Sequence, residues 1–380
     1  MKKITVILLM ILISAAFGFV IGYFGVTLFE NLVERQTANE VLLYAVLLIC
    51  LVLSFMLHIP LHEAGHLLSG KLSGYDFVSF RVLNIMFIKQ NGKIARKKFK
   101  IVGTLGQCLM SPPEPVDGRY PFVLYNLGGS LMNLTASAAG LGFYLLFSKA
   151  LPMAAAICAV FAIVGILMSL INLIPMKPGG VANDGYNALT LVKRESARRA
   201  FWLLLRINTL TQQGARFRDM PAEWFDIPDD GLNDTITTVI ALYRFSYLLD
   251  KHDFAEAKIL AELLLNGADK MLEIHKTELR CELLFLEIIG ECRVEEIERI
   301  YDKKLKNYIK ATGVYVSHQR LLYAYEKLVV NDEGNAQKVL DRFQKACLTY
   351  PNVGEIESER DLIEVIDNIA LKKRRQLNKC

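Results

Sequence analysis

Four apolar segments in the first half of the chain are each long enough to cross a lipid bilayer. They cover residues 4–29, 41–68, 122–147 and 153–174. A helix needs about 20 apolar residues to span the hydrocarbon core, and a single segment inside a bilayer satisfies its backbone polar groups by forming a helix. The sequence therefore predicts a mainly α-helical, polytopic membrane protein with four transmembrane helices. We expect the first to be retained rather than cleaved as a signal peptide.

The segments between these spans differ in charge. Residues 69–120 hold nine lysines and arginines against three acidic residues, whereas residues 30–40 hold one arginine and three glutamates. Positively charged loops stay on the cytosolic side. We therefore expect a multi-pass cell-membrane protein whose N- and C-termini are both cytosolic.

The basic loop contains two β-prone runs on either side of Asn91-Gly92, over residues 77–101. This dipeptide is favoured in tight hairpin turns. The pattern predicts a short β-hairpin at the cytosolic membrane surface, where its lysines and arginines would favour anionic headgroups.

The second half of the chain has the character of a soluble helical protein. Residues 191–231 predict a basic juxtamembrane helix and a linker, and residues 232–380 a cytosolic domain. Within it, segments that begin at Tyr243, Leu283 and Tyr323 share an apolar run, a polar turn and a second apolar run. This predicts a TPR-like domain of helical repeats that offers a surface to a protein partner. A plain helical bundle is the alternative.

The remaining histidines and cysteines show no ligand spacing. The seven cysteines contain no CxxC pair, which indicates reduced thiols. His252, His275 and His318 are isolated in the sequence and are expected to be surface or packing residues. The net charge of +5 is a mild basic excess, and we expect no nucleic-acid partner.

The second span carries the sequence HEAGH, which contributes His62, Glu63 and His66. Ionisable residues at membrane depth are costly and are rare without a partner or a function. In an H-E-x-x-H pattern on a helix, both imidazoles lie on one face and can bind one zinc ion, and the glutamate can act as general base. His58 precedes His62 by one turn, and the sequence leaves open whether it belongs to this site or packs between helices.

A catalytic zinc site needs a third protein ligand and an open position for water. Asp184 is the only carboxylate between Asp117 and Glu195, and it follows the last span closely. It is therefore the candidate third ligand. An N-cap of the helix that follows would also explain an aspartate at this position.

Three motifs within residues 41–191 resemble the site-2 protease family of intramembrane zinc metalloproteases, peptidase family M50. They are HEAGH, NLGGSLMNL and NLIPMKPGGVANDG. The resemblance implies a core of three transmembrane helices and one Zn²⁺ per chain, bound by His62, His66 and Asp184. It implies Glu63 as general base, and Asn133 near the active site, where it helps to hold the substrate or the oxyanion.

Two departures from the family pattern concern this site. A Gly-Ser pair precedes Asn133 where the family commonly has Gly-Pro. Five residues separate Pro178 from Asp184, four more than is usual. These extra residues must loop out if Asp184 is to reach the metal.

The expected function is that of an intramembrane zinc metalloendopeptidase. By resemblance, its substrates would be membrane-tethered regulators, remnant signal peptides or small peptide precursors. One alternative is a membrane-anchored quality-control metalloprotease, whose third ligand would be a downstream glutamate. Another is a non-catalytic adaptor with a structural metal site, which would need a fourth protein ligand such as His58.

Overall fold

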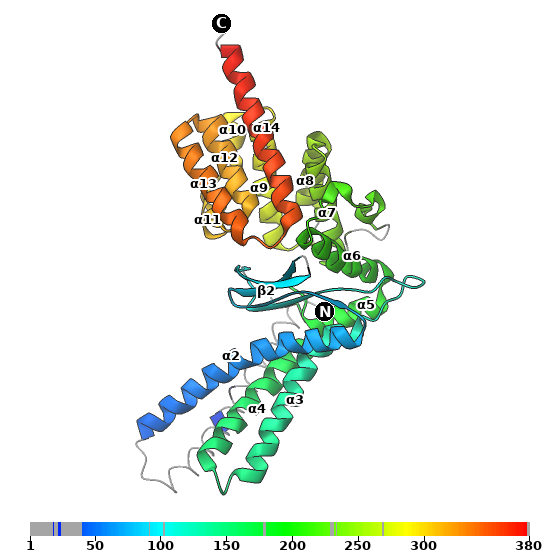
Figure 1. Cartoon of the computed structure of the whole chain (residues 1–380), viewed down its shortest axis with the longest axis vertical. Helices are drawn as coiled ribbons and strands as arrows, with labels where there is room; N and C mark the ends of the chain where they lie inside the picture. The colour runs from blue at the N-terminus through cyan, green and yellow to red at the C-terminus, as the bar shows by residue number, and fades with distance from the viewer. Residues whose placement is uncertain are drawn as a thin grey trace. The chain divides into compact units, whose positions relative to one another are not determined.

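The chain forms two compact units. The computed structural model describes residues 18, 22–23, 40–90, 92–101, 103–177, 180–228, 232, 234–267 and 270–377. Met1–Val82 and Leu105–Arg194 make up the N-terminal unit, and Leu83–Thr104 and Glu195–Cys380 make up the C-terminal unit. The architecture is mainly helical, with a small antiparallel β component (Figure 1).

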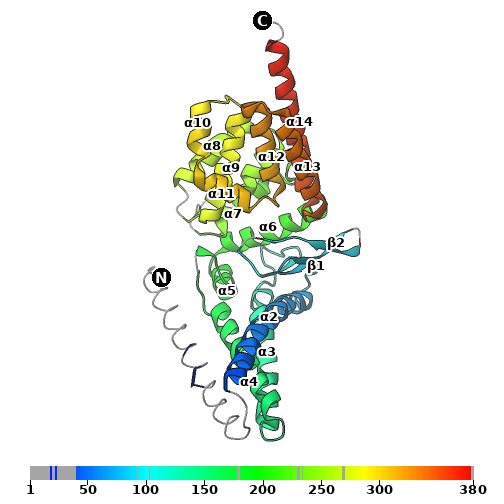
Figure 2. The same cartoon turned by 90° about the vertical axis from the view of Figure 1, so that its left-hand side faces the viewer.

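Three helices of the N-terminal unit are long and apolar enough to cross a membrane. They are α2 (Glu40–Leu72), α3 (Val123–Phe147) and α4 (Pro152–Leu173). Each packs against the other two, as Figures 1 and 2 show. The span predicted at residues 4–29 lies outside the described residues, apart from positions 18, 22 and 23.

The surface of α2 changes character along its length. Its first half exposes large apolar side chains, including Leu48, Val52, Leu53 and Leu57. These side chains would be unfavourable in water but suit contact with lipid. From His58 onward the helix turns polar side chains inward, with His58 fully buried and His66 9% exposed. The three apolar helices indicate membrane association, with the histidine motif enclosed by protein.

The predicted hairpin over residues 77–101 is divided between two strand pairs. Strands β2 (Ile85–Gln90) and β3 (Lys93–Lys98) form an antiparallel hairpin. Strand β1 (Asp76–Val82) pairs with β4 (Gly106–Ser111). The chain breaks direction at Leu83, whose φ of 55° is left-handed and interrupts an extended strand. The observed hairpin is therefore shorter than the predicted one.

The hairpin belongs to the C-terminal unit. Met86, Ile88 and Phe99 are buried in the core of that unit. The Phe99 ring packs edge-on against Tyr350, and Lys97 Nζ donates to the carbonyl oxygen of Tyr350 at 3.1 Å. Helical residues of the unit therefore cover the apolar face of the hairpin.

The rest of the C-terminal unit is helical. It contains α6 (Glu195–Gln212), the short turns η2 (Phe217–Asp219) and η3 (Ala222–Phe225), α7 (Thr237–Asp250), α8 (Phe254–Gly267), α9 (Glu273–Ile289), α10 (Val294–Ile300), α11 (Lys303–Ala311), α12 (Val316–Tyr325), the π-helical turn η4 (Glu326–Val330), α13 (Glu333–Thr349) and α14 (Val353–Leu377). Helix α6 packs on α7 and α14. Much of the segment expected to be a linker, residues 191–231, is thus integrated into this unit.

The three similar sequence segments each form two helices that meet at a left-handed residue. That residue is His252 between α7 and α8, Cys292 between α9 and α10, and Asn331 before α13. A left-handed residue ends a helix and reverses the chain within a few positions. The regular spacing seen in the sequence therefore corresponds to turns of the same backbone conformation.

Candidate metal centre

The two histidines of the HEAGH motif face each other across one turn of α2. Residues four apart on a helix lie on the same face. The Nε2 atoms of His62 and His66 are 3.1 Å apart, and the two rings are nearly perpendicular at 81°. Two imidazole nitrogens at this separation are positioned to bind a single metal ion.

A backbone carbonyl fixes the tautomer of His66. Its Nδ1 atom is 2.7 Å from the carbonyl oxygen of Tyr125 on α3. A carbonyl oxygen can only accept, so Nδ1 carries the hydrogen and Nε2 keeps its lone pair. A metal-binding histidine commonly has its other ring nitrogen held in this way.

Asp184 brings a carboxylate to the same point. Its Oδ2 atom is 3.0 Å from His62 Nε2 and 3.5 Å from His66 Nε2. The carboxylate comes from the first residue of α5 (Asp184–Lys193). The structure thus places together the three side chains that the sequence named as candidate ligands.

Asn183, rather than Asp184, is the N-cap of α5. Its side-chain oxygen accepts a hydrogen bond from the Tyr186 amide at 2.9 Å. The capping role that competed for Asp184 in the sequence is therefore filled by its neighbour. The Asp184 carboxylate remains available to the histidines.

Asn183 also closes the loop that precedes the aspartate. Its amide donates to the Met176 carbonyl oxygen at 3.1 Å, and the Met176 amide donates to Asn183 Oδ1 at 3.1 Å. Asn183 Nδ2 contacts the carbonyl oxygens of Ile171 and Ile174 at the end of α4. Pro178 and Gly179 lie outside the described residues. The extra residues are thus accommodated between two positions that are hydrogen-bonded to each other.

Sequence reasoning missed Asn183. The available signal was an Asn-Asp pair at the start of a helical pattern, because asparagine caps helices as well as aspartate does. Gly185 follows the pair for a steric reason. A Cβ atom at this position would collide with the carbonyl oxygen of Leu173, so glycine allows α5 to begin directly against the end of α4.

Glu63 lies beside strand β4. A Cβ atom on Gly106, the first residue of that strand, would collide with the Glu63 carboxylate. The strand is held in place by Arg81, whose Nη2 donates to the Gly106 carbonyl oxygen at 3.2 Å. It is also held by Tyr125, whose hydroxyl donates to the Cys108 carbonyl oxygen at 2.8 Å. The base candidate is thus next to both His62 and an extended backbone segment.

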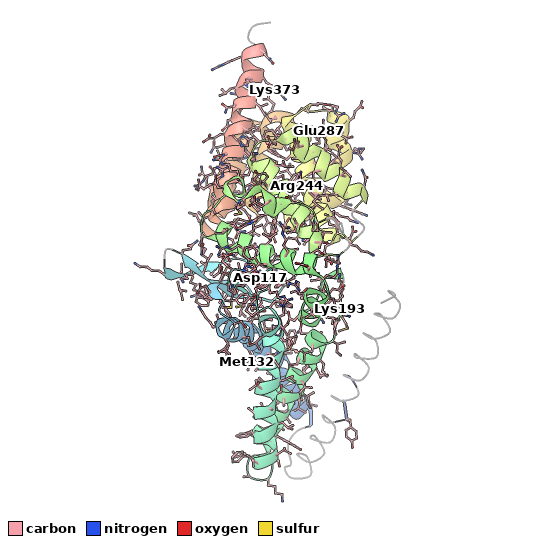
Figure 3. All side chains as sticks on the ribbon, turned by 90° about the vertical axis from the view of Figure 1, so that its right-hand side faces the viewer. Asp117, Met132, Lys193, Arg244, Glu287 and Lys373 are labelled. Atoms are coloured by element: carbon pink, nitrogen blue, oxygen red, sulfur yellow. The ribbon has the colours of Figure 1, made fainter. Side chains whose placement is uncertain are left out.

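Glycines let α2 and α3 approach closely at the histidine motif. A Cβ atom on Gly129 would collide with the His62 ring, and one on Gly65 with Gly128 and with Met132, which Figure 3 labels on α3. Helices approach this closely in membranes when small residues line their contact. The Gly-Gly pair of NLGGSLMNL therefore has a packing role at His62.

Asn133 and His58 contact each other rather than the three candidate ligands. His58 Nδ1 is 3.1 Å from Asn133 Oδ1, and His58 Nε2 donates to the Phe161 carbonyl oxygen at 3.0 Å. Both side chains are fully buried. His58 therefore links α2 to α3 and α4, and both of its ring nitrogens are already engaged.

The three candidate ligand atoms fit a zinc ion. Tetrahedral zinc with bonds of about 2.0 Å places neighbouring ligand atoms about 3.3 Å apart, and the separations here are 3.0, 3.1 and 3.5 Å. An electropositive species, either a proton or a metal ion, must lie between His66 Nε2 and the Asp184 carboxylate, and a zinc ion would fill this role. Among the described residues, the group contains three protein ligands, which leaves a tetrahedral ion one position for water.

Burial and neighbouring charge set the ionisation of two side chains around the centre. Burial alone would raise the pKa of the Asp184 carboxyl. Hydrogen bonds with His62 and His66 together lower this pKa by more than burial raises it, so it lies well below its usual range. Burial, followed by the charge of Glu63, raises the pKa of the Cys108 thiol. Asp184 is therefore an ionised ligand candidate, whereas Cys108 stays a neutral thiol.

Comparisons of the chain with models of known protein families, with curated proteins and with solved structures found no match.

Proposed function

We propose that the protein is an intramembrane zinc metalloendopeptidase. The observation that carries this proposal is the convergence of His62, His66 and Asp184, with Glu63 adjacent, in a unit built on three apolar helices. The residues His62, His66 and Asp184 would hold one Zn²⁺ per chain. The fourth position of that ion would hold the water molecule that attacks the peptide.

Glu63 acts as the general base. When bound, zinc acidifies a water molecule and polarises the peptide carbonyl. Glu63 accepts a proton from the attacking water and then passes it to the leaving amine. Tyr125 contributes by holding His66 in the tautomer that presents Nε2 to the centre.

Strand β4 would position the substrate. It begins at Gly106, beside Glu63, and among the described strands it pairs only with β1. An unwound substrate segment could add to the other edge of β4 through main-chain hydrogen bonds. Such pairing would require no particular side chains and would bring a peptide carbonyl toward Glu63.

Asn133 supports the substrate site indirectly. Its side chain contacts His58, one turn before His62 on α2. We assign it to positioning this part of the bundle, close to the substrate. A direct contact with an oxyanion would require the Asn133 side chain to turn away from His58.

The chain crosses the membrane four times, with residues 4–29 as the first helix and both termini in the cytosol. The charge of residues 69–120 supports this orientation. The substrates are membrane-embedded or membrane-tethered proteins, or small peptide precursors. The C-terminal helical pairs form TPR-like repeats that bind a protein partner or substrate, and their shared left-handed turns support this assignment.

The site geometry disfavours the two alternatives. A structural zinc site is closed by four protein ligands, and His58 is already bonded to Phe161 and Asn133. A quality-control metalloprotease would take its third ligand from a downstream glutamate, whereas the carboxylate that lies 3.0 Å from His62 Nε2 is that of Asp184. The protease function with Asp184 as ligand is the best-supported reading.

The test compares membrane proteins and released peptides from cells that express wild-type protein or Glu63→Gln. This variant keeps all three ligands and loses the base. We expect one or a few membrane peptides to accumulate uncut with Glu63→Gln and to be cleaved with wild type. Glu114→Gln, a substitution in the same unit, should behave as wild type. Equal peptide profiles for wild type and a zinc-loaded Glu63→Gln variant would contradict the proposal.

A further inference from the structure

A second group of metal-ligating side chains lies inside the C-terminal unit. Glu278 and Cys281 on α9 and His318 on α12 place their ligand atoms within 4.8 Å of one another. Cys281 and His318 are 1% and 0% exposed. No sequence pattern indicated this group because 40 residues separate Glu278 from His318, and His318 was expected to be a surface or packing residue.

Thr312 determines which nitrogen of His318 carries hydrogen. The Thr312 hydroxyl donates to the Tyr308 carbonyl oxygen at 2.6 Å, so its oxygen acts as an acceptor toward His318. His318 Nδ1 lies 2.8 Å from this hydroxyl oxygen and 3.2 Å from the Thr312 carbonyl oxygen. Both partners accept, so the hydrogen resides on Nδ1.

The lone pair of His318 Nε2 then points at another acceptor. Nε2 is 2.9 Å from Glu278 Oε2, and Cys281 Sγ is part of the same group. Tyr308 donates its hydroxyl to the other oxygen of Glu278, which fixes the orientation of the carboxylate. An electropositive species must therefore lie between Nε2 and Oε2, either a proton or a metal ion.

We propose that Glu278, Cys281 and His318 form a second metal site that binds a zinc-like transition-metal ion. A thiolate and an imidazole beside one carboxylate favour zinc over the oxygen-preferring magnesium and calcium ions. Thr312 and Tyr308 provide the outer hydrogen bonds that orient ligands in metal sites. The ion would join α9 to α12 across the core of the unit.

The site has an accessible side. Glu278 and His275 line a cavity of about 260 Å³ in the C-terminal unit. His275 Nδ1 is buried and, among the described residues, has no hydrogen-bond partner. A water molecule in this cavity can complete the coordination of the ion. His275 is the candidate protein ligand on the same side.

Cobalt substitution of the full-length protein tests the proposal. Thiolate coordination gives cobalt(II) a charge-transfer band in the near ultraviolet, which a site of histidines and aspartate does not produce. We expect metal-depleted protein to develop this band when cobalt(II) is added. Cys281→Ser should abolish it, and Cys347→Ser, at another buried cysteine of the same unit, should preserve it.

The number of zinc ions bound per chain provides the second measurement. We expect two zinc ions per wild-type chain and one per chain in both Cys281→Ser and Asp184→Ala, because each variant removes a different site. No thiolate band at saturating cobalt(II) would overturn the proposal and would indicate a shared proton between His318 and Glu278. A band that survives Cys281→Ser but disappears in Cys108→Ser would overturn it as well. Absence of the band leaves the centre at His62 unaffected, whereas loss of the band in Cys108→Ser would place the thiolate near Glu63 instead.

Discussion

Asn183 and Met176 are hydrogen-bonded to each other twice, through the Asn183 amide to the Met176 carbonyl oxygen and through the Met176 amide to Asn183 Oδ1. This pair closes the loop that holds the extra residues, which must loop out for Asp184 to reach the histidines. The same asparagine caps α5. Asn183 therefore both closes the loop of additional residues and caps α5. These two roles position the Asp184 carboxylate beside His62 and His66.

Asn183→Ala should weaken metal binding at the centre although no ligand is changed. The variant loses the side-chain bonds to the Met176 amide, the Tyr186 amide and the end of α4, and keeps only its backbone bond to Met176. Asp184 is then held less firmly in position. Loss of a group that orients a ligand typically lowers metal affinity by roughly 10–100-fold. Competition with a zinc chelator measures this, and Asn187→Ala on the same helix is the control. Unchanged affinity would show that Asp184 is positioned by other contacts.

Gly185→Ala should displace α5 from the end of α4. The added methyl group would collide with the Leu173 carbonyl oxygen, and such overpacking typically costs about 1–3 kcal/mol. Gly142→Ala is the matched control, since a Cβ atom there meets nothing within 4 Å. We expect a lower thermal midpoint and reduced zinc content for Gly185→Ala alone. Equal behaviour of the two variants would contradict the close approach at Gly185.

Gly106→Ala should reduce peptide hydrolysis without removing the metal. Its methyl group would displace the Glu63 carboxylate but lies on a strand that supplies no metal ligand. General-base catalysis typically contributes about 10²–10⁴-fold to a rate, so a loss within this range is expected at constant zinc content. The assay follows cleavage of a peptide that accumulates with Glu63→Gln. Full activity would show that peptide hydrolysis does not depend on the position of the Glu63 carboxylate against β4.

The sequence predicted which side chains meet at the centre better than the contacts that bring them together. His62, Glu63 and His66 follow from helical periodicity, and apolar segments long enough to span a bilayer agree with α2, α3 and α4. Both signals are local, because each depends on residues within a few helical turns. Asp184 was named as the third ligand because no other carboxylate lies near the last span and because of the resemblance, and the structure places it with His62 and His66.

The features that the sequence did not predict depend on long-range contacts. The β-prone run that begins at residue 77 gives no indication that its first strand ends before a left-handed Leu83 or that this strand pairs with β4. Asn183 caps a helix but also bonds to residues up to 12 positions away. The group around His318 forms only when α9 packs against α12. A local periodic pattern in the sequence cannot indicate contacts between residues that are far apart along the chain.

Glu287 should make the stability of the C-terminal unit depend on pH. Its carboxylate is 1% exposed and accepts hydrogen bonds from Arg293 and Lys258. The hydrogen bonds from Arg293, then those from Lys258, lower the pKa of Glu287 from 4.5 to about 2. A lowered folded-state pKa stabilises the fold above pH 4.5, and this contribution disappears as the pH falls toward 2.

Glu287→Gln should therefore lower the free energy of unfolding by roughly 1.5–3 kcal/mol at neutral pH. The difference from wild type should shrink between pH 4.5 and pH 3. Denaturant unfolding followed by tryptophan fluorescence measures this unit specifically, since both tryptophans, Trp202 and Trp224, belong to it. Glu298→Gln at an exposed position is the control. A difference that does not change with pH would contradict the assignment.

The most direct test of the metal centre is the zinc content of purified full-length protein with Asp184→Ala or Glu195→Ala. Asp184 is the proposed third ligand, and Glu195 is the next carboxylate along the chain. We predict that Asp184→Ala loses one zinc ion per chain relative to wild type, and that Glu195→Ala loses none. Full zinc content in a folded Asp184→Ala variant would contradict the account, and loss of zinc in Glu195→Ala would place the third ligand downstream.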